Sequence, residues 1–333
     1  RYYLKEWLFH KALKEEGIIS LRYNFVKVVL NGQDLGIYAL EEHFDKILTE
    51  NNQRKEGVII RFDESMDWEE FLQFKDISWS QTLSGYGSYT SAGIDAFQTK
   101  RIIENPILRN QYNIASKLLN GFRNKKFSLS NVFDVDKLSK YFALCDLFGA
   151  AHATYWNNMR FYYNPITRRL EPIGYDAMCR YTEELIIYNK AAHNRVYLEP
   201  IFTDSLFIDS YWRNVNDYVS NSFSKNFLSK YQVQLNKQVD LLKCEWPFFE
   251  PQTSFIHKKE KVIKTLLHPD HSTITYINNQ IDKRIIISVG NIQFLPINEF
   301  SLSLSDTISV PSLYKSIIDG KAYDQIVEFN DVA

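Results

Sequence analysis

Apolar residues in the N-terminal part of the chain change from a helical to a strand-like spacing. Over residues 2–16 they recur every three or four positions, which predicts a helix. The apolar runs 25–30 and 35–42 flank Asn31 and Gly32, a turn pair typical of hairpins. The beginning of the chain therefore predicts a helix followed by a two-stranded hairpin.

The middle of the chain returns to helical spacing and then forms a second hairpin. After a third strand over 58–62, apolar positions predict helices over 105–121 and 134–149. Two apolar blocks within 159–175 flank an Asn-Pro turn and predict strands. Helical spacing also runs through two C-terminal segments, 212–239 and 274–285.

These elements predict an α+β fold with two lobes. A Gly/Ser/Tyr-rich stretch at 84–93 is typical of an exposed loop and suggests a lobe boundary. We expect a small sheet-containing N-terminal lobe over 1–85, truncated at its start, and a larger, mainly helical lobe over 86–292. Residues 293–333 are expected to be a linker or the start of a further β-rich domain. Because a helical pattern is already under way at Arg1, we interpret the chain as part of a longer protein.

Composition narrows the function classes. The chain has 39 Lys and Arg against 40 Asp and Glu, so its net charge of -1 gives no electrostatic reason to expect nucleic acid as a partner. A hydrophobic content of 45% excludes a disordered chain. Three scattered cysteines indicate neither a disulfide framework nor a zinc site. No apolar run approaches the roughly 18 residues of a transmembrane segment.

Candidate chemistry is concentrated in residues 134–176. The predicted helix leads into a polar loop with His152, Asn157 and Asn158, and the second hairpin then leads to Asp176. Protein kinases use this order, with a catalytic base in the loop, a metal-binding Asn after it and a metal-binding Asp after a hairpin. Two oxygen ligands must reach one metal ion, and a base must stand beside the attacking hydroxyl. A hairpin brings the two ligand positions together.

Three segments stand out in combination: NFVKVVLNGQDLGIYALEEHF at 24–44, GVIIRFDE at 57–64 and YFALCDLFGAAHATYWNNMRFYYNPITRRLEPIGYD at 141–176. Together they resemble the CotH-type kinases, a family named for a spore coat protein and distantly related to protein kinases. The resemblance covers roughly residues 1–290 and implies a two-lobed atypical kinase-like fold. It places Gly36 in a hairpin over the nucleotide, Arg61 at the phosphates and Asp176 on the metal. Glu42, at the end of this hairpin, is expected either to orient Arg61 or only to face solvent.

The chain also departs from the family pattern. His152 stands where the family has a catalytic Asp, and Arg61 stands where a Lys is usual. Met178 replaces a second Asp. An imidazole can still act as a base near neutral pH, whereas Arg contacts phosphate differently from Lys. Asp146, nearly two helical turns before His152, is expected to be a charge on the helix surface.

The resemblance implies ATP and Mg²⁺ or Mn²⁺ as cofactors, with Asn157 or Asn158 joining Asp176 on the metal and His152 as the base. The expected partners are a nucleotide and a protein acceptor or surface partner, in an exported, cell-surface or extracellular setting. Two functions stay open. One is phosphoryl transfer, and the other is a pseudokinase or surface assembly module. A glycan-associated role is a third interpretation, which rests on aromatic residues and on the habit of the family.

Overall fold

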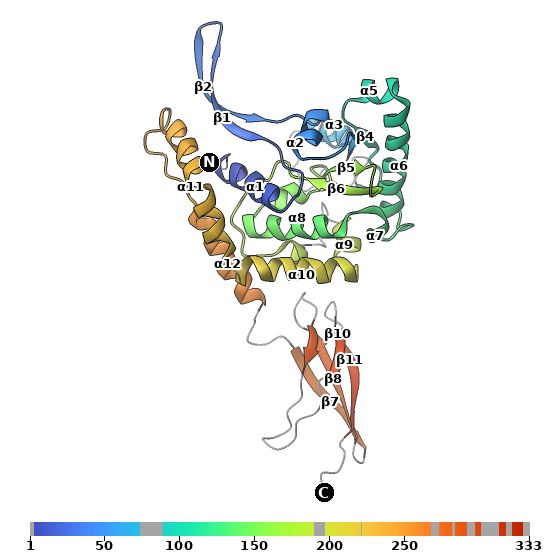
Figure 1. The fold of residues 1–333 in the computed structure, drawn as a ribbon. Helices are drawn as coiled ribbons and strands as arrows, with labels where there is room; N and C mark the ends of the chain where they lie inside the picture. Colours follow the sequence, from blue (N-terminus) through green and yellow to red (C-terminus); the bar gives the residue numbers. More distant parts are fainter. Residues whose placement is uncertain are drawn as a thin grey trace. The chain divides into compact units, whose positions relative to one another are not determined.

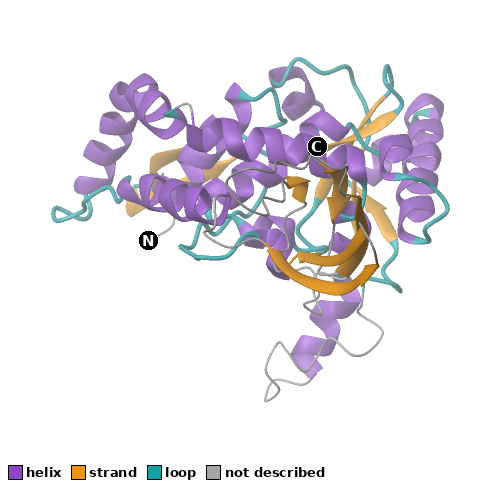
Figure 2. Cartoon of the chain, turned by 90° about the horizontal axis from the view of Figure 1, so that it is seen from below, coloured by secondary structure: helices purple, strands orange, loops and turns teal. Residues whose placement is uncertain are grey.

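The computed structural model describes residues 3–73, 89–189, 197–220, 222–267, 273–281, 284–291, 297–300, 313–317 and 322–328. Contacts within the chain divide it into two compact units, Arg1–Ile263 and Lys264–Ala333 (Figure 1). All helices that the structure describes lie before residue 268, and they are purple in Figure 2. The α+β class expected from the sequence is confirmed.

A four-stranded antiparallel sheet organises the first unit. Its order is β4 (Ile94–Ala96), β3 (Ile59–Phe62), β5 (Arg160–Asn164) and β6 (Arg169–Ile173). The second hairpin thus pairs with the third strand, and its register sets Arg61 opposite Arg160. Strand β3 precedes the lobe boundary expected near residue 85 and its three partners follow it, so this sheet joins segments from both sides of that boundary.

One face of this sheet carries an apolar cluster that covers its centre. The short helix α2 (Lys46–Asn51) contributes to the cover, and the Asp45 side chain caps it by accepting from two backbone amides. Burial of these side chains fixes the helix against β3 and β5. The cluster comprises Ile19, Leu21, Phe44, Leu48, Ile59, Tyr162 and Ile173, with Phe97 and Tyr175 packed beside it.

A buried helix, α8 (Val135–Phe148), forms the centre of the helical part. Asp134 caps its start, and Gly149 ends it in the left-handed conformation at φ +64°. A side chain at Gly149 would meet the Arg180 carbonyl oxygen at 2.0 Å, so only glycine fits there. Helices α1 (Tyr3–Glu15) and α10 (Ser205–Ser220) contact α8.

The remaining helices of the structure are α3 (Ser65–Gln73), α5 (Thr99–Glu104), α6 (Pro106–Arg123), α7 (Leu129–Val132), α9 (Glu199–Phe202), α11 (Phe223–Lys243) and α12 (Ser254–Leu267). None of the helices in the described ranges combines the length and apolar character that crossing a membrane requires.

The first hairpin forms as the Asn-Gly turn predicts. Strands β1 (Tyr23–Leu30) and β2 (Gln33–Glu41) pair antiparallel and extend away from the four-stranded sheet (Figure 1). Side chains near the end of α11 hold both strands. The Gln238 amide oxygen accepts from the Phe25 amide at 3.2 Å, and the Glu245 carboxylate accepts from the Ile37 amide at 2.5 Å.

After the end of α12, the described residues of the second unit are strands. Strands β7 (Thr273–Ile281), β8 (Arg284–Asn291) and β11 (Ala322–Glu328) form one sheet, and β9 (Ile297–Phe300) pairs with β10 (Leu313–Ile317). The helix predicted over 274–285 is therefore wrong. Its isoleucines do recur at helical spacing, but a short stretch rich in β-branched residues forms strands equally well.

Candidate functional site

His152, Asn158 and Asp176 meet at one place in the first unit. His152 lies in a short 3₁₀ turn, Ala151–Thr154, that follows the end of α8, and Asp176 follows β6. The imidazole Nδ1 is 3.0 Å from the Asp176 carbonyl oxygen and 3.4 Å from its carboxylate Oδ2. The Asn158 amide nitrogen lies 2.9 Å from the same Nδ1 and donates to the His152 carbonyl oxygen at 3.1 Å.

The backbone around Asp176 is unusual and is held by a distant helix. Asp176 and Met178 both have φ of +44°, a left-handed conformation that side chains disfavour. Glu6, on α1, accepts hydrogen bonds from the Ala177 amide at 2.7 Å and the Met178 amide at 3.1 Å. The conformation of this segment therefore depends on contacts with α1.

Negative charge gathers around Asp176. Burial raises the pKa of Glu6 to about 7, and the Asp176 charge adds to this shift although the Ala177 amide opposes it. Although Glu41 is exposed at the surface, desolvation and the Asp176 charge raise its pKa to about 7 as well. A cation placed at Asp176 would relieve this repulsion.

Arg61 belongs to a network that reaches the same region through Arg160. The Arg61 guanidinium lies 3.2 Å from Glu64 and 3.4 Å from Asp95. The Arg160 guanidinium shares Glu64 at 3.3 Å, donates to the Asn157 carbonyl oxygen at 2.5 Å and is only 3% exposed. Burial lowers the pKa of Arg160, while the Glu64 charge opposes the shift. Each arginine keeps a buried Nε without a hydrogen-bond partner within the described ranges.

Glu42 and Gly36 lie away from this network. The Glu42 carboxylate binds the Arg22 guanidinium at 2.8 Å and the Asn51 amide at 2.6 Å, so the expectation that it orients Arg61 is wrong. Gly36 has φ of +84° in β2, and a side chain there would meet Glu245 at 2.6 Å. Its neighbour in the structure is thus the segment after α11.

Two buried charges fix the chain that follows Asp176. Asp146, expected on a helix surface, is only 2% exposed, and it accepts from the Ile186 amide at 2.8 Å and the Tyr211 hydroxyl at 2.7 Å. Asp146 therefore lies on the buried side of α8, where its carboxylate satisfies these two donors. Lys259 is 1% exposed and donates to the carbonyl oxygens of Thr182 and Glu184 at 2.8 and 2.7 Å.

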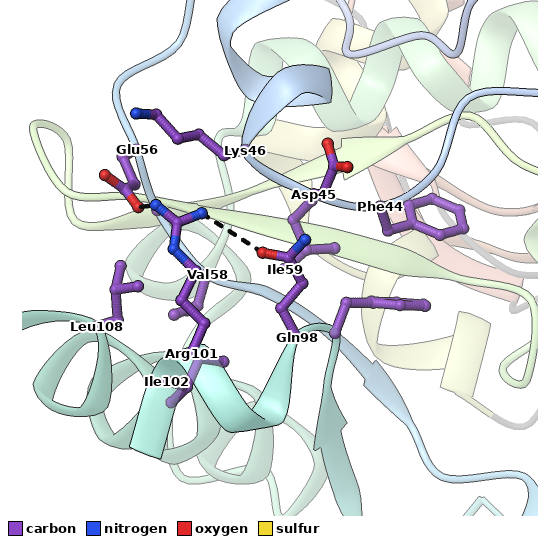
Figure 3. Close-up of a pocket in the computed structure, with 12 residues that line it drawn as sticks. Phe44, Asp45, Lys46, Glu56, Val58, Ile59, Gln98, Arg101, Ile102 and Leu108 are labelled. Carbon is purple, nitrogen blue, oxygen red and sulfur yellow. Dashed lines mark hydrogen bonds and ion pairs between the residues drawn. The ribbon is translucent and has the colours of Figure 1, made fainter. Parts of the chain in front are cut away.

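A small hollow between α2, β3 and α5 lies elsewhere in the same unit (Figure 3). Its floor is apolar, and Arg101 points across it toward Glu56 and Gln98. Arg101 and Glu56 thus pair with each other at its rim, and its lining includes neither His152 nor Asp176. It does not form part of the candidate site.

The oxygen groups at Asp176 fit a magnesium or manganese ion that takes its remaining ligands from water and from a substrate. Among the residues described, no three His, Cys, Asp or Glu side chains could hold a metal on their own. Magnesium commonly takes one or two protein carboxylates and completes its shell with water and phosphate oxygens. Asp176 would supply a carboxylate to such an ion. The Asn158 side chain donates to the His152 carbonyl oxygen through its nitrogen, so its amide oxygen is the atom that would bind a cation.

The family model described as CotH kinase protein matches residues 1–265 of the chain. The chain belongs to the CotH kinase family. The match contains the whole first unit and ends before the strands of the second, which is earlier than the expected limit near residue 290. No curated protein matches this CotH kinase family member.

Sequence patterns missed three residues of the candidate site: Glu6, Glu64 and Arg160. Arg160 was detectable as a charge inside the otherwise apolar strand block that begins at Met159. Glu6 adjoins Trp7 on the buried side of α1, where an acid requires a partner. Glu64 gave no signal, because a charge after a strand is common.

Proposed function

We propose that this protein is an atypical kinase that uses ATP with Mg²⁺ or Mn²⁺ to phosphorylate a protein acceptor. The observation that carries the proposal is the contact of His152 with both Asn158 and Asp176, residues that the order of elements along the chain and the family resemblance had assigned to one site. Membership of the CotH kinase family supports the reaction class. An exported, surface setting is part of the proposal and follows from the same family.

Each residue has a defined task in this proposal. Asp176 and an amide oxygen of Asn157 or Asn158 hold the metal, which neutralises phosphate charge when bound. His152 accepts the proton of the acceptor hydroxyl. Arg61 is 26% exposed at its side chain, and it binds phosphate by exchanging its contact with Glu64 or Asp95 for the substrate.

A pseudokinase is the second candidate, and the position of His152 favours it. A protonated imidazole 3.4 Å from the Asp176 carboxylate would place positive charge where a metal ion must bind. The site would then serve recognition or assembly at a surface rather than phosphoryl transfer. The two candidates make opposite predictions for labelling by ATP.

Radiolabelled ATP with Mg²⁺ or Mn²⁺ tests both candidates in the full chain. The kinase proposal expects autophosphorylation or acceptor labelling that Asp176→Ala abolishes and His152→Ala lowers by about a hundredfold or more. Asp136→Asn, on the exposed side of α8, is the matched control and should label normally. Nucleotide binding in calorimetry without any labelling would support the pseudokinase, and the absence of both would contradict either candidate.

A further inference from the structure

Glu6 joins the first helix to the segment that carries Asp176. Its carboxylate is almost fully buried, with the whole residue 7% exposed. One oxygen accepts from the Ala177 amide at 2.7 Å and the other from the Met178 amide at 3.1 Å. Two successive amides are therefore held by one side chain that comes from 171 residues earlier in the chain.

The amides that Glu6 holds belong to a strained stretch of backbone. Asp176 and Met178, on either side of Ala177, are both in the left-handed region at φ of +44°. Residues other than glycine remain there only when their surroundings impose the conformation. The Glu6 carboxylate supplies this constraint from one side.

The end of α8 holds the same segment from another direction. The Asp176 carbonyl oxygen meets His152 Nδ1 at 3.0 Å, and the Arg180 amide donates to the Gly149 carbonyl oxygen at 2.9 Å. The backbone that carries Asp176 is thus held both by α1 and by the turn after α8.

We infer that Glu6 is a positioning residue for the cation site, holding the Asp176 carboxylate toward Asn158 through the amides of Ala177 and Met178. The inference rests on the proposed function, because it presupposes that the Asp176 carboxylate binds the metal ion. Each Glu6 oxygen accepts from a backbone amide of the segment that carries Asp176, so this role of Glu6 is exerted through the backbone. Indirect partners of this kind commonly change metal affinity by about ten- to a hundredfold.

The experiment compares Glu6→Gln with Glu15→Gln in the full chain. Gln keeps the size of Glu6 but turns one acceptor into a donor that faces an amide. Glu15 lies on the same helix and binds Lys230 and Tyr231, away from Asp176, so its variant controls for a general loosening of α1. The measurements are hydrogen exchange of a peptide spanning residues 176–179 and Mn²⁺ affinity from paramagnetic resonance titration. Glu6→Asp, which keeps the charge, serves as the second variant.

We expect Glu6→Gln to exchange at least about tenfold faster in this peptide and to bind Mn²⁺ about tenfold more weakly or worse. Glu15→Gln should match the parent in both measurements, and Glu6→Asp should fall between them. Faster exchange with unchanged Mn²⁺ affinity would overturn the inference, as would unchanged exchange. A parent protein that binds no Mn²⁺ would instead overturn the proposed function and the inference with it.

Discussion

The imidazole Nδ1 of His152 lies 3.4 Å from the carboxylate Oδ2 of Asp176. The residue at the position of the catalytic base therefore contacts the residue at the position of the metal ligand directly. A substitution at either residue therefore also removes a contact of the other. Any account of the activity has to treat them as a pair.

Asp176→Asn should remove stabilisation by metal ions. If Mn²⁺ binds at Asp176, a concentration of about 100 times its dissociation constant raises the unfolding free energy by about 2.7 kcal/mol. The variant should unfold at the same temperature with and without Mn²⁺, as followed by circular dichroism. The control is Asp136→Asn on α8, which should keep the metal-dependent shift. An equal shift in Asp176→Asn and the parent would locate the metal elsewhere.

Glu64→Gln should destabilise the first unit strongly. Its carboxylate lies 3.3 Å from Arg160, whose guanidinium is 3% exposed, so the substitution leaves a buried charge without compensation. We expect a loss of about 3 kcal/mol in urea unfolding. Asp34→Asn breaks the exposed ion pair with Lys27 in the first hairpin and should unfold as the parent does. A Glu64→Gln variant as stable as Asp34→Asn would show that the Arg160 network carries little energy.

Lys259→Met should loosen the segment that follows Asp176. Met keeps the length of the side chain but removes the donors to the carbonyl oxygens of Thr182 and Glu184. Each hydrogen bond that the charged Lys259 ammonium donates stabilises the fold by about 1.5–3 kcal/mol. The loss should appear in urea unfolding together with faster hydrogen exchange over residues 180–186. Lys258→Met, at an exposed neighbouring position, should change neither quantity.

Stability should fall between pH 5 and pH 8 because of Glu6. Its folded pKa, about 7, lies above the ordinary value of 4.5, so the folded state holds a proton that the unfolded state has lost in this window. The unfolding free energy is therefore highest near pH 5 and declines as the pH rises through 7, by about 2–3 kcal/mol for this group. Urea unfolding in chelator-treated buffer measures the slope.

The matched pair for this pH dependence is again Glu6→Gln and Glu15→Gln. Glu6→Gln should have a shallower slope, whereas Glu15→Gln should keep the slope of the parent. Some slope should remain in Glu6→Gln, since the pKa of Glu41 is also raised to about 7. A parent whose stability rises with pH over this range would contradict the raised pKa of Glu6.

Local sequence signals predicted the elements that carry the site. The helix predicted over 134–149 forms as α8, which Asp134 caps and Gly149 ends. The Asn31 and Gly32 turn closes the first hairpin. These features depend on residues a few positions apart, which is why a single sequence reveals them.

Pairing between distant segments was not predictable from these signals. Glu42 was expected to orient Arg61 or only to face solvent, yet it binds Arg22, which lies opposite the end of β2. Asp146 was expected on the helix surface because it lies nearly two turns before His152. That spacing does not reveal that α10 packs there and that its Tyr211 hydroxyl donates to Asp146. In both cases the partner was decided by packing of the whole unit rather than by local spacing.

The attachment of the first hairpin to α11 has a consequence for synthesis and folding. The partners of Phe25 and Ile37 are Gln238 and Glu245, which follow them by 213 and 208 residues. An isolated two-stranded hairpin is only marginally stable in water, so the pairing of β1 with β2 is marginal while the chain emerges from the ribosome. At a synthesis rate of about 5–20 residues per second, roughly 10–40 seconds pass before the partner residues in and after α11 are made. During that interval Val29, Leu30 and Leu40, each more than half exposed even in the folded chain, offer an apolar edge to chaperones or to other nascent chains.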